Sequence, residues 1–362
     1  MEVTGIRILI DVGHPAHVHF FRNAIKLWED HGHTVLVTAR DKDVVVPLLK
    51  AYNLNYLYLG KSKKTILGKS FNMLKIDFNL LKVAIKFKPD VLLGIHDPYI
   101  SHVGKLMHKP VIIFTDTELV KYTWLVFPFS SVVCTPASFR LDLGSKHIRY
   151  EGYHELAYLH PNYFRPNSDV LDELGLSEKD SIIIVRLISW SAYHDVGLRG
   201  LNSELGLIKT LEEFGHVFIS SERKLNGSLE KYKLPLNPEK LHDLLYYARL
   251  YIGEGGTMAV ESAILGTPAI HIESTSNGLP SGSLTGIFRE LRDRYGLLYF
   301  YADQNQALLK AVELLEKGRA IKKMWRAKRE NLLKDKIDVT KWMVNLVEGY
   351  PDSIREYRNN GR

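Results

Sequence analysis

The segment from Tyr251 to Ile270 (YIGEGGTMAVESAILGTPAI) restricts the fold more than any other part of this sequence. It predicts a short apolar strand that ends in a glycine turn, then a helix that Gly266 and Pro268 stop before another strand. A helix N-terminus carries unpaired N–H groups and a partial positive charge, and glycines leave room for close approach. The segment therefore predicts a strand, a turn and a helix that bind an anion such as a diphosphate.

The predicted nucleotide-sugar contacts in this turn are Glu254, Gly255, Gly256 and Thr257. Glu261 follows four residues after Thr257, where a carboxylate could accept hydrogen bonds from ribose hydroxyls. The alternative is an ordinary crossover between parallel strands, whose glycines only permit tight packing. A lone pair of glycines would favour that alternative. The full combination with Glu261 and the closing Gly-x-Pro favours a binding site.

Apolar strand patterns alternate with helical patterns along the whole chain, which predicts an α/β fold with mainly parallel sheets. Strands are expected at residues 6–12, 33–39, 55–59, 91–94, 111–114, 132–134, 181–186, 217–220, 250–252, 269–272 and 297–300. The length of 362 residues suggests two domains, each of about 150 to 180 residues. The stretch 160–168, with two prolines and polar neighbours, has the composition of a linker.

We therefore expect two Rossmann-like domains, the first at 1–162 on the acceptor side and the second at 163–335 for the nucleotide sugar. Residues 336–362 are expected to form a C-terminal helix and tail that could pack back on the first domain. Because ligands of open α/β sheets bind at the carboxyl ends of the strands, the two sheets should face an interdomain cleft.

A second candidate loop, residues 11–21, follows the first expected strand and holds three histidines within six positions, His14, His17 and His19. A proline and the change from loop to helix make convergent metal ligation awkward, so we expect no metal. A histidine at such a corner can act as a hydrogen-bond donor or as a general base near neutral pH. His17 is the candidate catalytic residue here, and Gly13 and His14 are candidate nucleotide-sugar contacts.

Carboxylates follow two further expected strands of the first half. Asp97 comes after the strand at 91–94, and Asp116 and Glu118 come after the strand at 111–114. Carboxylates at strand ends over a cleft can act as acid or base, or can orient a histidine. They could equally be N-caps of the helices that follow, and this alternative applies most directly to Asp97. We treat all three as candidate catalytic residues.

Between Lys61 and Lys88 the chain has eight lysines and one acidic residue, Asp77, interleaved with large apolar residues. This pattern is typical of a helix that lies on an anionic membrane. It fits equally well a helix packed on its own sheet with its lysines in solvent. The net charge of +7 suits an anionic partner without choosing among partners. We expect no nucleic acid among them, and the sequence leaves the oligomeric state open.

The single cysteine, Cys134, excludes an internal disulfide framework, and its apolar neighbours indicate a packed residue rather than a nucleophile. No stretch approaches the roughly 18 uninterrupted apolar residues of a membrane span, and the first residues lack the pattern of a signal peptide. We expect a cytoplasmic protein in which any membrane contact is peripheral.

The segment from Tyr251 to Ile270 resembles the donor-binding segment of GT-B nucleotide-sugar enzymes, in which a glycine-rich turn, a helix glutamate and a closing Gly-x-Pro recur together. The resemblance implies that Glu261 holds the ribose. Ala16-His17-Val18 resembles the N-terminal corner of the lipid-linked N-acetylglucosaminyltransferases of peptidoglycan synthesis, which implies an acceptor-side role for His17. Those enzymes have several glycines where this chain has the residues 13–16.

Ile95-His96-Asp97, with Asp116 or Glu118, is similar to the first domain of UDP-N-acetylglucosamine 2-epimerases, which carries His-Gly-Asp and a later glutamate. The His-Arg-Arg-Glu signature of their second domain has no match in residues 185–191. That difference counts against simple epimerase chemistry.

Taken together, residues 11–43, the end of the linker, 186–195 and 244–270 resemble an archaeal and bacterial family without assigned function, domain of unknown function 354. That family is related to the 2-epimerases and to GT-B glycosyltransferases. The resemblance covers nearly the whole chain and implies the fold, while the reaction follows only from its neighbours, because one scaffold serves several chemistries.

The favoured expectation is a metal-independent, inverting glycosyltransferase that needs no cofactor and takes a nucleotide sugar, preferably a UDP-sugar, as substrate. Arg186 and Ser189 would bind the donor together with the glycine turn. The acceptor would be lipid-linked or another saccharide. The first alternative is a sugar-nucleotide epimerase in which Asp97, Asp116 and Glu118 move protons. The second is a non-catalytic nucleotide-sugar-binding protein that needs no base.

Overall fold

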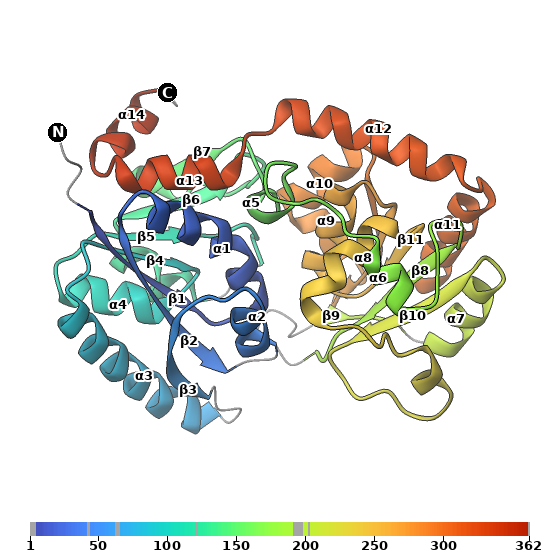
Figure 1. Ribbon diagram of the computed structural model, residues 1–362, viewed down its shortest axis with the longest axis horizontal. Helices are drawn as coiled ribbons and strands as arrows, with labels where there is room; N and C mark the ends of the chain where they lie inside the picture. The colour runs from blue at the N-terminus through green and yellow to red at the C-terminus, as the bar shows by residue number, and fades with distance from the viewer. Residues whose placement is uncertain are drawn as a thin grey trace. The chain divides into compact units, whose positions relative to one another are not determined.

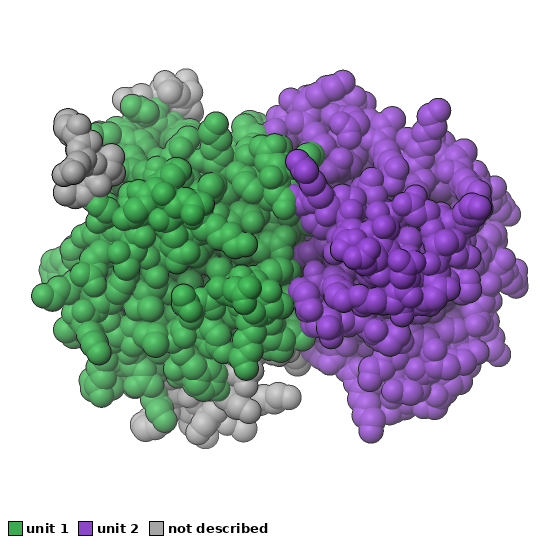
Figure 2. Space-filling model, viewed as in Figure 1, with its two compact units in different colours: residues 1–116, 120–163, 337–362 green, residues 117–119, 164–336 purple. Residues whose placement is uncertain are grey.

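The computed structural model describes residues 5–41, 44–61, 66–119, 122–190, 198–201 and 203–360. The chain divides into two compact units (Figure 2). Unit 1 comprises residues 1–116, 120–163 and 337–362, and unit 2 comprises residues 117–119 and 164–336. The end of the chain therefore belongs with the N-terminal unit, and the boundary at 163 falls within the stretch of linker composition.

Unit 1 contains a parallel sheet of seven strands in the order β3-β2-β1-β4-β5-β6-β7 (Figure 1). The strands are β1 (Arg7–Val12), β2 (Thr34–Asp41), β3 (Tyr56–Lys61), β4 (Val91–Ile95), β5 (Val111–Phe114), β6 (Val132–Pro136) and β7 (His147–Tyr150). The helices are α1 (Pro15–Asp30), α2 (Val45–Ala51), α3 (Ile66–Phe87), α4 (Pro98–Leu106), α5 (Leu156–Leu159), α13 (Val339–Glu348) and α14 (Asp352–Asn360).

The central strands β1, β4, β5 and β6 form where the sequence has continuous apolar runs, as strands covered on both faces require. In β5 all four residues are buried, and in β1 only Arg7 is exposed. Leu9 and Leu92 of the sheet pack with Leu80 of α3 and Val103 of α4 in one core cluster. Cys134 of β6 is buried among these strands and is not paired, as the sequence predicts, and burial raises the pKa of its thiol.

Unit 2 contains a parallel sheet of five strands in the order β10-β8-β11-β12-β14 and a short antiparallel pair, β9 with β13. Its strands are β8 (Ile182–Leu187), β9 (Leu198–Arg199), β10 (His216–Ser221), β11 (Leu250–Gly253), β12 (Ala269–Ile272), β13 (Ser274–Thr275) and β14 (Leu298–Tyr301). Its helices are α6 (Asp169–Glu173), α7 (Glu204–Glu212), α8 (Leu241–Tyr247), α9 (Gly256–Leu265), α10 (Gly286–Asp293), α11 (Gln304–Glu316) and α12 (Ala320–Asp335).

Short 3₁₀ helices lie at Thr123–Leu125, Phe127–Phe129, Gly144–Lys146, Gly227–Tyr232, Pro238–Lys240 and Ser281–Leu284. In each sheet the chain leaves in opposite directions from two neighbouring strands, β1 and β4 in unit 1 and β8 and β11 in unit 2. The carboxyl ends at such a position are where open α/β sheets bind ligands. Among the described residues, no helix is long and apolar enough to cross a membrane.

Candidate functional site

Three charged side chains are buried where β1, β2 and β4 end. Arg40 makes ion pairs with Asp11 and, at 2.8 Å, with Asp97. The hydroxyl of Thr38 donates to Asp11 at 2.6 Å, and Asp97 accepts the backbone N–H of Ile100 at 3.0 Å as the N-cap of α4. Of the two roles predicted for Asp97, the structure shows the N-cap, with a side chain that is 1% exposed.

The two carboxyl groups of this cluster titrate differently. Burial raises the pKa of Asp11 despite the charge of Arg40, and the neighbouring Asp97 raises it further. Burial acts on Asp97 in the same direction, but Arg40 and the hydrogen bonds that Asp97 accepts outweigh it and lower its pKa. Arg40 therefore contacts both carboxyl groups, but only the pKa of Asp97 is lowered. A Cβ on Gly13 would lie 2.2 Å from a guanidinium nitrogen of Arg40, which explains this glycine without any ligand.

His14 and His17 both bond to the backbone of their own loop. His14 Nδ1 accepts the N–H of Ala16 at 3.2 Å and caps α1, and His17 Nδ1 accepts the N–H of Gly13 at 3.4 Å. A neutral imidazole carries its proton on one nitrogen only, so the proton of neutral His17 lies on Nε2. In this tautomer Nε2 is the nitrogen of His17 that can donate a hydrogen bond.

Asp116, just after β5, pairs with a histidine that sequence reasoning did not find. Its Oδ2 lies 3.3 Å from Nδ1 of His154, and the side chains of Asp116 and His154 are 30% and 7% exposed. Burial lowers the pKa of His154 despite the opposing charge of Asp116. The lowered pKa leaves the imidazole neutral at pH 7, and its ring packs on Phe20 with centroids 4.4 Å apart. No motif marked His154, because it lies in the loop between β7 and α5.

Glu118 belongs to unit 2, whereas Asp116 belongs to unit 1. Oε1 of Glu118 accepts the backbone N–H of Gly286, the first residue of α10, at 3.0 Å.

The glycine turn of unit 2 joins β11 to α9, as the sequence predicts. Gly255 has φ of 83°, a conformation that favours glycine, and it is the N-cap of α9. No side chain caps the first turn of this helix, which begins at Gly256. The first N–H groups of a helix lack partners within the helix, so this end of α9 can bind an anion.

Glu254, in contrast, faces into the unit. Its carboxylate accepts the backbone N–H of Ile188 at 2.9 Å and of Leu201 at 2.8 Å, and the residue is 1% exposed. Burial raises its pKa, and these two hydrogen bonds oppose the shift. A Cβ on Gly200 would lie 1.9 Å from the carboxylate. Glu254 therefore anchors two strand-end loops.

Arg186 and Ser189, predicted to assist the donor, both contact Glu222. Arg186 makes an ion pair with Glu222 and donates to Ser220 Oγ at 2.9 Å. The backbone N–H and hydroxyl of Ser189 each lie 3.2 Å from Glu222. The charge of Arg186 is thus balanced within the protein. The sequence resemblance also included part of the stretch 191–197, which lies outside the described residues.

Glu261 lies within α9 and forms a buried pair with His242 of α8. Their Oε1 and Nε2 atoms are 2.9 Å apart, and the side chains are 6% and 3% exposed. The ring of Phe164 meets His242 edge to face at 6.5 Å. His242 thus fixes one oxygen of the carboxylate predicted to hold ribose, a partner that sequence spacing does not reveal.

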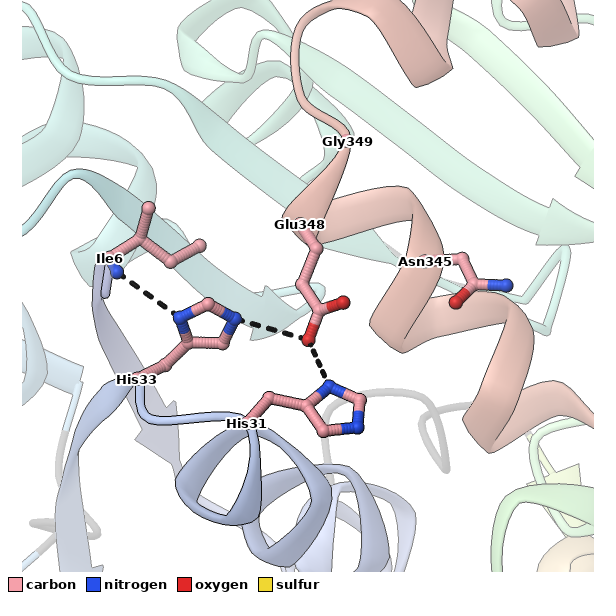
Figure 3. Close-up of a pocket in the computed structure, with 6 residues that line it drawn as sticks. All are labelled: Ile6, His31, His33, Asn345, Glu348 and Gly349. Atoms are coloured by element: carbon pink, nitrogen blue, oxygen red, sulfur yellow. Dashed lines mark hydrogen bonds and ion pairs between the residues drawn. The ribbon is translucent and has the colours of Figure 1, made fainter. Parts of the chain in front are cut away.

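A separate pocket of about 470 Å³ in unit 1 contains the one group of potential metal ligands found among the described residues (Figure 3). Glu348 Oε1 lies 2.7 Å from His31 Nδ1 and 3.1 Å from His33 Nε2. His33 Nδ1 accepts the N–H of Ile6 at 3.2 Å, so its neutral ring carries the proton on Nε2. That nitrogen donates to Glu348 and has no lone pair for a metal. The cluster ties α13 to the start of the sheet.

Comparison with known families matches residues 6–343 to a family described as Protein of unknown function (DUF354). An uncharacterised protein of Methanocaldococcus jannaschii is 26% identical over 283 residues, which cover 74% of this chain and 81% of the relative. These findings confirm the family that the sequence resemblance predicted.

Solved structures with the same architecture include nucleotide-sugar enzymes. The MnaA–UDP co-structure from S. aureus has a TM-score of 0.66 at 14% identity and covers 97% of this chain and 98% of its own. The UDP-GlcNAc 2-epimerase from Neisseria meningitidis bound to UDP-GlcNAc has a TM-score of 0.59 at 13% identity, covering 94% and 99%. The Streptomyces glycosyltransferase SsfS6 has a TM-score of 0.58 at 14% identity, covering 95% and 99%. At these identities the likeness establishes the fold, and the predicted GT-B class is confirmed.

Proposed function

The chain belongs to the DUF354 family of proteins of unknown function, and we propose that it is a GT-B glycosyltransferase that uses a nucleotide-activated sugar. The reaction is inverting and metal-independent, and its preferred donor is a UDP-sugar. It serves the synthesis of surface polysaccharide or glycoconjugate. The observation that carries the proposal is the uncapped N-terminus of α9 after a glycine turn, beside the position in the sheet where the chain leaves β8 and β11 in opposite directions. Similar structures in complex with UDP and UDP-GlcNAc support it.

The donor binds through its diphosphate and its ribose. The N–H groups of Gly256 and Thr257 at the start of α9 donate to the diphosphate, and the helix dipole stabilises the charge that the leaving nucleoside diphosphate develops. Glu261, held by His242, accepts hydrogen bonds from the ribose hydroxyls. Arg186 reaches the diphosphate only if it leaves Glu222, so it contributes less than the helix.

Asp116 is the general base that removes the proton of the acceptor hydroxyl. Its side chain is partly exposed, whereas Asp97 is buried beside Arg40. Nδ1 of neutral His154 lies 3.3 Å from Oδ2 of Asp116, and the other carboxylate oxygen takes the proton of the acceptor hydroxyl. His17 acts as a hydrogen-bond donor through Nε2, because its Nδ1 accepts the backbone N–H of Gly13.

Glu261→Gln should weaken UDP binding by about 1.5 to 3 kcal/mol, since a hydrogen bond to a charged group contributes about that much. Glutamine keeps the shape of the side chain and an oxygen that accepts from His242, so the fold should survive. Isothermal titration calorimetry with UDP measures the change. Glu313→Gln, a substitution on the exposed face of α11, is the matched control and should bind as the wild type does. If the wild type binds UDP and Glu261→Gln binds it with the same affinity, Glu261 does not hold the ribose.

A sugar-nucleotide epimerase is the second candidate, favoured by the likeness to the UDP-GlcNAc 2-epimerase fold. Incubation with UDP-, GDP-, CMP- and TDP-sugars separates the candidates. An epimerase converts the donor alone, a transferase requires an acceptor, and a non-catalytic protein binds without turnover. Conversion of a UDP-sugar in the absence of any acceptor would replace the transferase proposal.

A further inference from the structure

Helix α3 has two apolar faces instead of one. Ile76, Leu80 and Ala84 are at most 3% exposed, and Leu80 and Ala84 join the core cluster of unit 1. These residues account for the packing of α3 on its own sheet, beside α4 (Figure 1). Packing of the helix on its own sheet, one of the two explanations that the sequence allows, therefore holds. This packing involves only one side of the helix.

The second face lies in solvent. Leu74, Phe78 and Ile85 are 66%, 55% and 57% exposed. Their spacings of four and seven residues place them on one stripe, roughly 140° around the axis from the buried face at 100° per residue. Single exposed apolar residues are common on protein surfaces, but an aligned stripe of large side chains marks an interaction surface.

Lysines flank this stripe on one side. Lys75, Lys82 and Lys86 are exposed and follow the same helical spacing, and the ammonium group of Lys82 lies 4.2 Å from the ring centroid of Phe78. Asp77, the acidic residue of α3, lies 3.2 Å from His102 Nδ1 on α4 and is thereby directed to the packed side. The exposed stripe and its border thus combine apolar and positive groups without a negative one among the described residues of α3.

We propose that this face of α3, defined by Leu74, Phe78, Ile85, Lys75, Lys82 and Lys86, docks on an anionic lipid surface. The apolar side chains enter the boundary between headgroups and acyl chains, and the lysines extend their ammonium groups to lipid phosphates. A second copy of the chain is a poorer occupant, because an antiparallel two-fold contact across the stripe would bring two rows of lysines together. The inference does not depend on the nucleotide-sugar chemistry proposed for unit 2.

The test is sedimentation of the full chain with vesicles of phosphatidylcholine alone or mixed with phosphatidylglycerol, at low and high salt. The wild type should sediment with the mixed vesicles at low salt, and less at high salt. Each lysine near an anionic surface contributes about 1 kcal/mol, a factor of about five, so Lys75→Glu/Lys82→Glu/Lys86→Glu should lose at least about 100-fold in binding. Leu74→Ser/Phe78→Ser/Ile85→Ser should also release the protein, with all lysines retained.

The matched control is Lys209→Glu/Lys323→Glu/Lys334→Glu, which makes the same change in net charge at exposed lysines of unit 2. It should bind vesicles nearly as the wild type does, and circular dichroism shows that every variant is folded. The proposal is overturned if the wild type stays in the supernatant, if the control loses as much binding as the α3 variants, or if the serine variant binds normally. Light scattering that shows a dimer for the wild type and a monomer for the serine variant, without vesicle binding, would instead assign this face to a second copy.

Discussion

Replacing Asp116 with asparagine should lower turnover about 10²- to 10⁴-fold, the usual contribution of a general base. Asparagine keeps the size of the side chain and an oxygen that can accept from Nδ1 of His154, but it cannot take a proton. The affinity for UDP should not change, because Asp116 lies in unit 1 and the proposed donor contacts lie in unit 2.

The measurement is steady-state turnover with the donor and acceptor pair found by the sugar-nucleotide panel, together with calorimetry of UDP. Asp142→Asn, at an aspartate side chain that is 86% exposed in unit 1, is the matched control and should be neutral. His154→Asn should cost less than Asp116→Asn, since it changes a neighbour of the carboxylate but leaves the carboxylate itself. Near-normal turnover in Asp116→Asn would show that Asp116 is not the general base.

Arg40→Met should destabilise the protein by about 3 to 5 kcal/mol, as expected when one partner of a buried ion pair is removed. Methionine fills much of the space but leaves Asp11 and Asp97 buried without a cation. Urea denaturation measures the free energy of unfolding, and Lys50→Met, at an exposed lysine of α2, is the control.

The same variant should be less destabilised at acidic pH. Without Arg40, both buried carboxyls hold their protons to a higher pH than they do in the unfolded chain. The folded state then binds more protons than the unfolded state, so the stability of the variant falls as the pH rises above the unfolded carboxyl range. A loss below about 1 kcal/mol at neutral pH, the size of an exposed ion pair, would show that Arg40 is not structurally essential.

The order of strands and helices could be predicted closely because its signals are local. The turn between β11 and α9 was predicted to within a residue, since glycines, apolar runs and a closing Gly-x-Pro determine the backbone structure of residues only a few positions away. β7 (His147–Tyr150) was not predicted, because it is an edge strand with alternating burial and polar residues. In α3 the sequence allowed either core packing or a surface contact. Periodicity does not show which apolar stripe meets the sheet.

By itself, the sequence determined the α/β alternation, the glycine turn at Gly255 and Gly256 before α9, and membership of the family, since each depends on neighbouring residues or on whole-chain resemblance. Only the tertiary structure decided the partners of the charged side chains. Asp97 and Arg40 are 57 positions apart, and Glu261 and His242 are 19 apart. Such pairs meet because strands and helices bring distant segments together in a dry interior, where a buried charge needs a partner. The sequence around one member of the pair does not identify the other.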